Sequence, residues 1–255
     1  MQAITRDVIQ ELRELKSAET SEATSDRHMA LLRAILNKCV RDWQVLDSVP
    51  KVPMFRPPTD EPRWLTRAEF ARLERELPDH LRAAARFAVL TGLRMRAMLS
   101  LTWSQVDLVN KHAWVAASDM KTGQSLGIPL TPEALKLVKS LPRKGENLFQ
   151  WHGERIDDCN TLAFQTAVRA AKLESLRWHD LRHTWASWAV QSGVTLHQLM
   201  LLGGWRSFSM VLRYAHSAPD HLAAAAAKIR MNYRTKTGTA KRPGRKSVAS
   251  HVLPD

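Results

Sequence analysis

Residues 179–188 read HDLRHTWASW, and this stretch decides more about the fold than any other part of the chain. Placed on a helical wheel at about 100° per residue, it separates into two faces. One face carries Leu181, Thr184, Trp185 and Trp188, and the other carries His179, Arg182, His183 and Ala186. We therefore predict a helix over 180–192 that packs on one face and presents a protonatable ring beside a fixed cation on the other. An ordinary solvated polar face would give the same pattern.

Two glycine-containing segments flank this helix in the sequence. The first, Thr91-Gly92-Leu93-Arg94, is a turn that leads into a helix and places Arg94 in its first turn, where backbone N–H groups also point outward. Such a position suits anion binding or a plain exposed arginine. The second, 201–216, reads LLGGWRSFSMVLRYAH: a glycine break, then a helix expected over 208–216. It contains Tyr214, and a tyrosine at such a position, taken alone, is typical of a half-buried packing residue.

The remaining pattern predicts a mainly α fold with a small β-hairpin or sheet. A capping box at Thr66 and Glu69, with Leu65 stapled onto Phe70, marks a helix start. Strands are expected over 112–117 and 125–129 around a Thr122-Gly123 turn. Apolar spacing predicts further helices over 4–16, 29–46, 79–90, 93–101, 132–140 and 159–171.

Composition shifts divide the chain into four expected parts. Residues 1–47 form a partial helical part, and 48–62 form a linker, because four prolines between Ser48 and Pro58 forbid a continuing helix. A larger domain follows over 63–233. The tail 234–255 carries six Lys and Arg against one acid, and we expect it to be disordered. It is as consistent with a solubilising end as with an arm that contacts DNA.

The charge balance favours a polyanionic partner. The 255 residues carry 38 Lys+Arg against 25 Asp+Glu, a net charge of +13, which is typical of nucleic-acid binding but also of a basic protein that merely resists association. The two cysteines, Cys39 and Cys159, have no neighbours at metal-ligand spacing, so we expect neither a disulfide framework nor a metal site. We read no export signal and no membrane span, and expect a cytoplasmic location.

Taken in order along the chain, five segments resemble the catalytic domain of the tyrosine recombinases, phage integrases in particular. The resemblance covers about 62–222, and its specificity lies in the ordered set. It implies that Arg94 and Arg182 clamp the scissile phosphate, that Lys121 at the hairpin tip is the catalytic lysine, and that Tyr214 is the nucleophile. It also gives His179 the role of the histidine that serves as base or bonds the phosphate. Trp205 fills the position where the family has His or Trp.

The resemblance implies a DNA breaking-and-rejoining fold and a site-specific recombinase, or integrase, of a prophage or other mobile element. The reaction needs no metal, cofactor or ATP, because a 3′-phosphotyrosyl link conserves the bond energy. The implied partners are double-stranded DNA attachment sites, three further copies in a homotetramer, and an accessory directionality factor. The implied location is the nucleoid of a bacterium or of a phage-infected cell.

Two alternatives stay open from the sequence. One is a tyrosine-type DNA topoisomerase, which uses a similar residue set. The other is a catalytically defective, truncated DNA-binding remnant, because family members usually carry a full core-binding domain where this chain has about fifty residues, a shortened core-binding (SAM-like) part. The family also usually carries Glu or Asp two to three residues after the first arginine, whereas Arg96 and Ala97 stand here.

Overall fold

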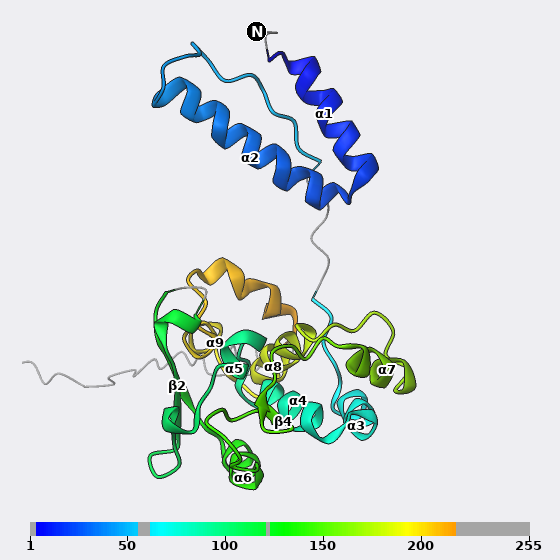
Figure 1. Ribbon diagram of the computed structural model, residues 1–255, viewed down its shortest axis with the longest axis vertical. Helices are drawn as coiled ribbons and strands as arrows, with labels where there is room; N and C mark the ends of the chain where they lie inside the picture. Colours follow the sequence, from blue (N-terminus) through cyan, green and yellow to red (C-terminus); the bar gives the residue numbers. More distant parts are fainter. Residues whose placement is uncertain (1–3, 56–61, 121–122, 218–255) are drawn as a thin grey trace, which may run out of the picture. The chain divides into compact units, whose positions relative to one another are not determined.

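The computed structural model describes residues 4–55, 62–120 and 123–217, and they fall into two compact units, 1–62 and 63–255 (Figure 1). Each unit has its own hydrophobic core. In the described ranges, we find no helix that combines the length and the apolar character needed to span a bilayer.

The first unit is a pair of helices, α1 (Arg6–Glu19) and α2 (Glu22–Arg41), packed on each other. Ser21 caps α2 through its side chain, so this helix begins seven residues before the predicted start at 29 and ends five before the predicted end. The segment after it is extended, as the prolines require. Its Val52 is nevertheless buried against Ile9, Met29 and Leu36, and the Phe55 amide donates to Asp26 Oδ1 at 2.8 Å.

The second unit is mostly helical, which confirms the predicted fold class. Its α-helices are α3 (Arg67–Glu76), α4 (Asp79–Thr91), α5 (Met95–Leu99), α6 (Pro132–Ser140), α7 (Leu162–Ala170), α8 (Asp180–Gln191) and α9 (Leu196–Gly203). Five of them lie within about three residues of the predicted ranges. The Thr66 and Glu69 capping box at the start of α3 is confirmed. The prediction missed α9, although Thr195 and Gln198 form the same kind of box at its start.

Short strands complete the unit. The predicted hairpin is present as β2 (His112–Val115) and β3 (Leu126–Pro129), paired antiparallel with Val115 opposite Leu126. A strand outside the prediction, β1 (Val106–Asp107), adds to β2. A separate small pair is formed by β4 (Gln150–Trp151) and β5 (Glu154–Arg155). Single turns of 3₁₀ helix, η1 (Trp103–Gln105) and η2 (Ala117–Asp119), precede β1 and follow β2.

One helix expected over 208–216 is replaced by two 3₁₀ segments, η3 (Phe208–Met210) and η4 (Leu212–Ser217). The reason is local: the hydroxyls of Ser207 and Ser209 hydrogen-bond to each other at the start of the segment. Serines that bond locally compete with the α-helical ladder and favour short turns. The tighter winding sets the direction in which Tyr214 leaves the backbone.

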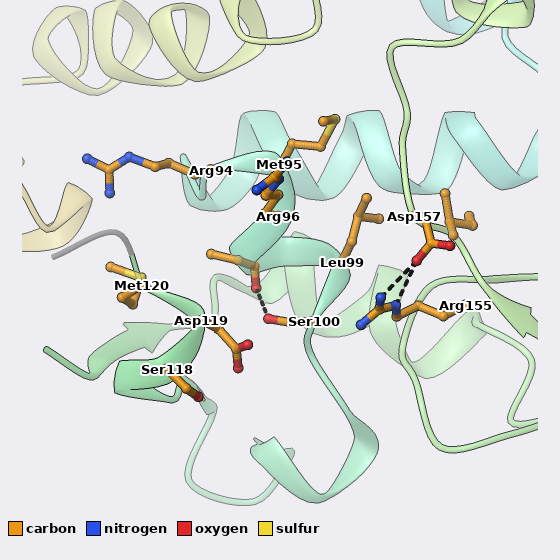
Figure 2. A pocket seen from close by; sticks show the side chains of 12 residues that line it. Arg94, Met95, Arg96, Leu99, Ser100, Ser118, Asp119, Met120, Arg155 and Asp157 are labelled. Atoms are coloured by element: carbon orange, nitrogen blue, oxygen red, sulfur yellow. Dashed lines mark hydrogen bonds and ion pairs between the residues drawn. The ribbon is translucent and has the colours of Figure 1, made fainter. Parts of the chain in front are cut away.

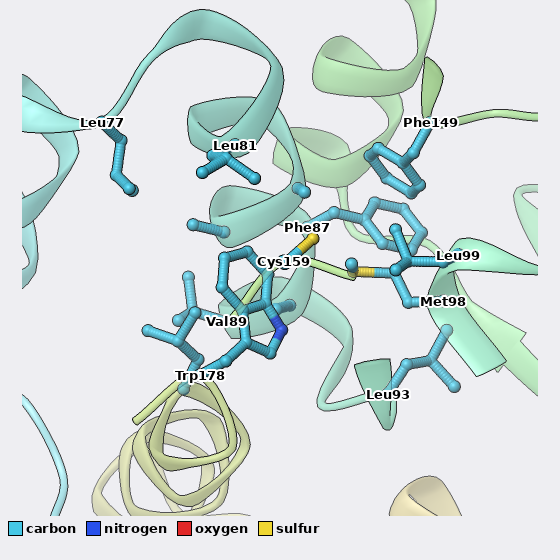
Figure 3. Packing of buried hydrophobic residues seen from close by; sticks show 14 of the residues in the cluster. Leu77, Leu81, Phe87, Val89, Leu93, Met98, Leu99, Phe149, Cys159 and Trp178 are labelled. Atoms are coloured by element: carbon cyan, nitrogen blue, oxygen red, sulfur yellow. The ribbon is translucent and has the colours of Figure 1, made fainter. Parts of the chain in front are cut away.

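The core of the second unit lies around α4 and the first turns of α8. Phe87 of α4 packs against Phe149 with ring centroids 5.3 Å apart (Figure 3). Trp178 packs against Phe164 with ring centroids 5.2 Å apart. Cys159 is buried among these rings, which raises the pKa of its thiol to about 12. A thiol held protonated in this way has an ordinary packing role.

Helix α8 is the central element of the unit, and α4, α9 and η4 all pack on it. It is tied to the start of the unit by two hydrogen bonds: the Leu65 amide donates to Thr184 Oγ1 at 3.0 Å, and Trp188 Nε1 donates to the Leu65 carbonyl at 2.8 Å. In Figure 1 the three-stranded sheet lies at one side of the unit and α7 at the other, with α4, α5 and α8 between them.

Gly92, the C-cap residue of α4, is the position at which a substitution can test the close packing of α4 on α8. It has φ +67°, and a Cβ there would lie 2.1 Å from Trp185. We expect Gly92→Ala to lower the free energy of unfolding by about 2 to 4 kcal/mol, from left-handed strain plus a steric clash. Gly123 is the matched control, since it has φ +66° and no neighbour within 4 Å. Gly123→Ala should cost only about 1 kcal/mol.

The measurement is chemical denaturation followed by tryptophan fluorescence, since Trp43 alone of the nine tryptophans lies outside the second unit. Equal losses in the two variants would contradict the close approach of Trp185 to Gly92.

Candidate active site

The start of α8 is held by a buried carboxylate. Asp180 accepts hydrogen bonds from the Arg177 backbone amide at 2.8 Å and from Arg177 Nη2 at 3.0 Å. An acidic residue in the first turn also complements the helix dipole. This arrangement fixes the helix end that carries His179 and, one turn later, His183.

Arg182 is buried, with 4% of its surface exposed, and its guanidinium bridges two turns of the chain. Nη1 donates to the Gly92 carbonyl, and Nη2 donates to the Gly203 carbonyl at 2.7 Å. The guanidinium carbon lies 4.1 Å from the centroid of the Trp205 ring. Burial and the nearby charge of Arg94 lower the pKa of Arg182 to about 9, which leaves it cationic at neutral pH.

The second face of α8 carries the predicted ring and cation, and it is not the ordinary solvated polar face that the sequence left open as an alternative. Arg182 and Ala186 on that face are buried, whereas His179 is exposed and His183 is half-buried. Arg182 and Ala186 are buried because α9 and η4, which a helical wheel of 179–188 does not include, cover this face. The protonatable ring and the fixed cation are present, but at the wall of a cavity.

Tyr214, on η4, is 1% exposed, and its hydroxyl lies 2.6 Å from His183 Nδ1. Its ring centroid lies 5.8 Å from that of Trp205, which in turn stacks on Trp185. Burial raises the pKa of Tyr214, while the positive charges of Arg182 and Arg213 act in the opposite direction. The tyrosine is thus neutral, buried and hydrogen-bonded to an imidazole.

These side chains line one cavity of about 440 Å³. Its lining consists of Arg94, His179, Arg182, His183, Trp205, Arg206, Met210, Arg213 and Tyr214. No carboxylate is among the described residues that line it. Arg94 Nη1 is buried there without a hydrogen-bond partner in the described part of the chain. A buried cationic donor without a partner is costly, so the cavity is suited to receive an anion.

Both histidines of the cavity are disfavoured as cations. Partial desolvation, then the charges of Arg182, Arg177 and Arg94, lower the pKa of His179 even though its ring is exposed, and Asp180 opposes them. Burial first, then His179, lowers the pKa of His183 to about 4, again opposed by Asp180. At neutral pH both rings are therefore neutral and each retains one unprotonated nitrogen.

The structure brings together five of the six residues that the sequence singled out: Arg94, His179, Arg182, Trp205 and Tyr214. The sixth, Lys121, lies outside the described residues. Its neighbour Met120 does lie near the site, since a Cβ at Gly204 would be 3.4 Å from the Met120 Cε atom.

Besides Met210, sequence reasoning gave no role to three polar residues that line the cavity: His183, Arg206 and Arg213. A signal existed for each. The wheel had placed His183 on the same face as Arg182, and the two arginines directly follow Trp205 and precede Tyr214.

A second cavity of about 880 Å³ shares Arg94 with the first. Figure 2 shows Arg94 extending away from Arg155 and Asp157, which pair with each other at 2.8 Å. Ala97 lines this cavity where the family usually has an acid, and so does Asp119 of η2. Among the described residues Asp119 forms no ion pair.

Fold and site together define a cavity lined by four arginines with a tyrosine at its wall. Residues 63–221 match the Phage integrase family. The chain therefore belongs to the phage integrase family. The integrase of Salmonella phage P22 is 34% identical over 229 residues, which cover 84% of this chain and 59% of that integrase. The chain thus spans about three fifths of the length of this relative.

Solved structures show the same fold. The catalytic domain of bacteriophage HP1 integrase aligns with a TM-score of 0.53 and 26% identity, covering 67% of this chain and 96% of that domain. The Tn1549 transposon integrase in complex with a circular intermediate DNA aligns with a TM-score of 0.71 and 18% identity, covering 87% and 85%. The fold is that of a tyrosine recombinase catalytic domain.

The burial of His183 predicts a pH dependence of stability. Its folded pKa is about 4, below the ordinary value of 6.5, so the folded state binds this proton less readily than the unfolded chain. The contribution of neutral His183 is complete above pH 6.5 and is lost as the pH falls toward 4. After allowance for solvent screening, we expect wild type to lose about 1 to 2 kcal/mol more than His183→Asn between pH 7 and pH 4.5.

Urea denaturation of both proteins at the two pH values gives this difference directly, and the other acid-sensitive groups cancel in the comparison. Parallel losses in wild type and His183→Asn would show that His183 titrates at its ordinary pKa in the folded protein.

Proposed function

We propose that this chain is a site-specific DNA recombinase of the integrase type, which cuts and rejoins DNA through a 3′-phosphotyrosyl link to Tyr214. The observation that carries the proposal is a tyrosine hydroxyl at the wall of a cavity lined by arginines, with Arg94 Nη1 buried and unpartnered there among the described residues. Membership of the phage integrase family supports the same activity.

Arg94 and Arg182 hold the scissile phosphate in this proposal. Exchanging one phosphodiester for another requires neutralisation of the charge on the non-bridging oxygens, and guanidiniums do this by paired hydrogen bonds. A guanidinium has five N–H donors, and Arg182 uses two on backbone carbonyls, so it is rigidly aimed and retains three for phosphate. Arg94 supplies the donor that is still unpartnered.

Trp205 keeps this clamp in place. Its ring packs under the Arg182 guanidinium and beside Tyr214, so it joins the cation to the nucleophile. A cation over an aromatic face gains about 0.5 to 2 kcal/mol, more where water is excluded. The role proposed for Trp205 is therefore positioning, with its indole N–H available to the phosphate.

Proton movement completes the reaction. The hydroxyl of Tyr214 must lose its proton as it attacks phosphorus, and the departing 5′ oxygen must gain one. Lys121, on the β2–β3 connection, is the residue that we assign to the 5′ oxygen. His179, exposed at the mouth of the cavity beside Arg94 and Arg182, is assigned to the phosphate.

The substitution of Ala97 for the family's acid leaves the bracing of Arg94 to another group. Asp119 lines the same cavity and carries the carboxylate that we assign to this role, two residues before Lys121. The proposed partners are double-stranded attachment sites, a homotetramer on two duplexes, and an accessory factor that sets direction. The proposed location is the bacterial nucleoid. For the segment 220–230 the sequence leaves open both an element that exchanges between copies and a simple packing helix, and this segment lies outside the described residues.

Covalent trapping tests the nucleophile. The probe is a pool of nicked duplexes whose sequence is randomised around the nick. The nick makes the released fragment, which carries the free 5′ hydroxyl, short enough to diffuse away after cleavage. Wild type and Tyr233→Phe should form an SDS-resistant DNA adduct at equal rates, in EDTA and without ATP, whereas Tyr214→Phe should form none. Sequencing the trapped DNA then identifies the attachment core.

Each rival has a distinct result. A Tyr214→Phe variant that traps as much DNA as wild type would make the nucleophile assignment wrong. Salt-sensitive binding without any adduct would favour the DNA-binding remnant, because phosphate contacts alone give a steep dependence on salt. Efficient relaxation of supercoiled plasmid lacking the trapped sequence would favour a topoisomerase.

A further inference from the structure

His183 is the group that meets the hydroxyl of the proposed nucleophile. Its Nδ1 lies 2.6 Å from Tyr214 Oη, a distance typical of a strong hydrogen bond. His179, the N-cap residue of the same helix, is exposed and has its ring centroid 5.1 Å from that of His183. No hydrogen bond joins His179 to Tyr214 within the described ranges.

The direction of the His183 to Tyr214 hydrogen bond follows from the chemistry of the cavity. A buried hydroxyl must place its hydrogen on an acceptor. The arginines and Trp205 that line the cavity offer only N–H donors, and Met210 offers a weak acceptor. Among the residues that the structure describes, neutral imidazole is the one strong side-chain acceptor in hydrogen-bond contact with Tyr214. The hydroxyl therefore donates to Nδ1, and the ring proton of His183 is on Nε2.

On this geometry we propose that His183 is the general base that takes the proton of Tyr214 when DNA is cut. The inference rests on the function proposed above. The Tyr214 O–H bond breaks and its proton passes to Nδ1, the Oη–P bond forms, and the P–O5′ bond breaks with a proton delivered to the 5′ oxygen from Lys121. On rejoining, Nδ1–H returns the proton to Tyr214. The step needs no oxidant, metal or further reactant.

The charges around His183 make its ability to take a proton depend on bound substrate. His183 faces His179, Asp180 and Arg182 on α8 and Arg213 on η4, with Arg94 and Arg206 lining the same cavity. The cations outnumber the one carboxylate, so an imidazolium is unfavourable while the cavity is empty of anion. A bound phosphodiester brings negative charge to the cavity and favours protonation of His183. Tyr214 is thereby activated where a phosphate is in place.

The test separates the proton taken from Tyr214 from the proton given to the 5′ oxygen. Single-turnover adduct formation is measured on the trapped nicked duplex, with either oxygen or sulfur at the bridging 5′ position, because a thiolate leaves without an acid. We expect His183→Ala and His183→Asn to be slowed roughly 100-fold or more on both substrates, which is the usual contribution of a general base. Lys121→Ala should be slow with oxygen and restored with sulfur.

Two further measurements distinguish a base from a positioning residue. The Asn side chain is large enough to keep a hydrogen bond to Tyr214 but cannot take a proton, so its loss of rate reports proton transfer. Added imidazole should restore His183→Ala, which leaves room for it, and not His183→Asn. His152→Asn is the matched control; His152 is exposed at a turn with φ 53°, which Asn tolerates, and the rate should not change.

The proposal is overturned if His183→Asn keeps the wild-type rate, if His183→Ala stays within about threefold of wild type, or if sulfur at the 5′ position restores either variant. Those results leave the recombinase function standing. Absence of any adduct with wild type instead removes the proposed function, and the role of His183 with it.

Discussion

The buried guanidinium of Arg182 is the interaction on which the site depends. It joins the carbonyl of Gly92, at the end of α4, to that of Gly203, at the end of α9, from a central position on α8. Three elements far apart in sequence are thereby held at one point. Removing a cation from water is expensive, and charge-assisted hydrogen bonds to backbone carbonyls together with the Trp205 ring offset that cost.

This bridge explains why glycines occupy both partner positions. A Cβ at Gly92 or at Gly203 would lie 2.1 Å from the rings of Trp185 and Trp205, so the backbone reaches Arg182 only where no side chain intervenes. The two tryptophans stack with centroids 6.0 Å apart and close the space behind the guanidinium. The two glycines, the two tryptophans and Arg182 thus pack as one cluster, and Tyr214 is positioned by its contact with Trp205 in that cluster.

Local chemistry made much of this predictable from sequence. The capping box at Thr66, the proline-initiated α6 and the hairpin of β2 and β3 depend on neighbours within a few residues, and the predictions for them were confirmed. The features that the sequence did not predict have two causes, one nonlocal and one local. The polar face of α8 is covered by α9 and η4, and no property of 179–188 reveals this. The 208–216 segment is apolar enough for a helix, but the local hydrogen bond between Ser207 and Ser209 favours 3₁₀ turns.

The candidate site residues were found by another route: their order along the chain resembles that of the tyrosine recombinases. Taken singly, Arg94 has the pattern of an exposed arginine and Tyr214 that of a half-buried packing residue, so neither stands out in sequence. His183 does not stand out, because a histidine on a helix is usually a packing or surface residue. Its importance comes from a 2.6 Å contact with a residue 31 positions away.

The electrostatics of the cavity lining oppose both the charge on Arg182 and protonation of the two histidines, so this region works against the stability of the fold. Functional sites commonly store such unfavourable terms, which the rest of the structure offsets. In the proposed reaction a bound phosphodiester relieves them, since its negative charge favours Arg182 and an imidazolium at His183 together. On that proposal, binding of the anion and activation of Tyr214 draw on the same electrostatic imbalance.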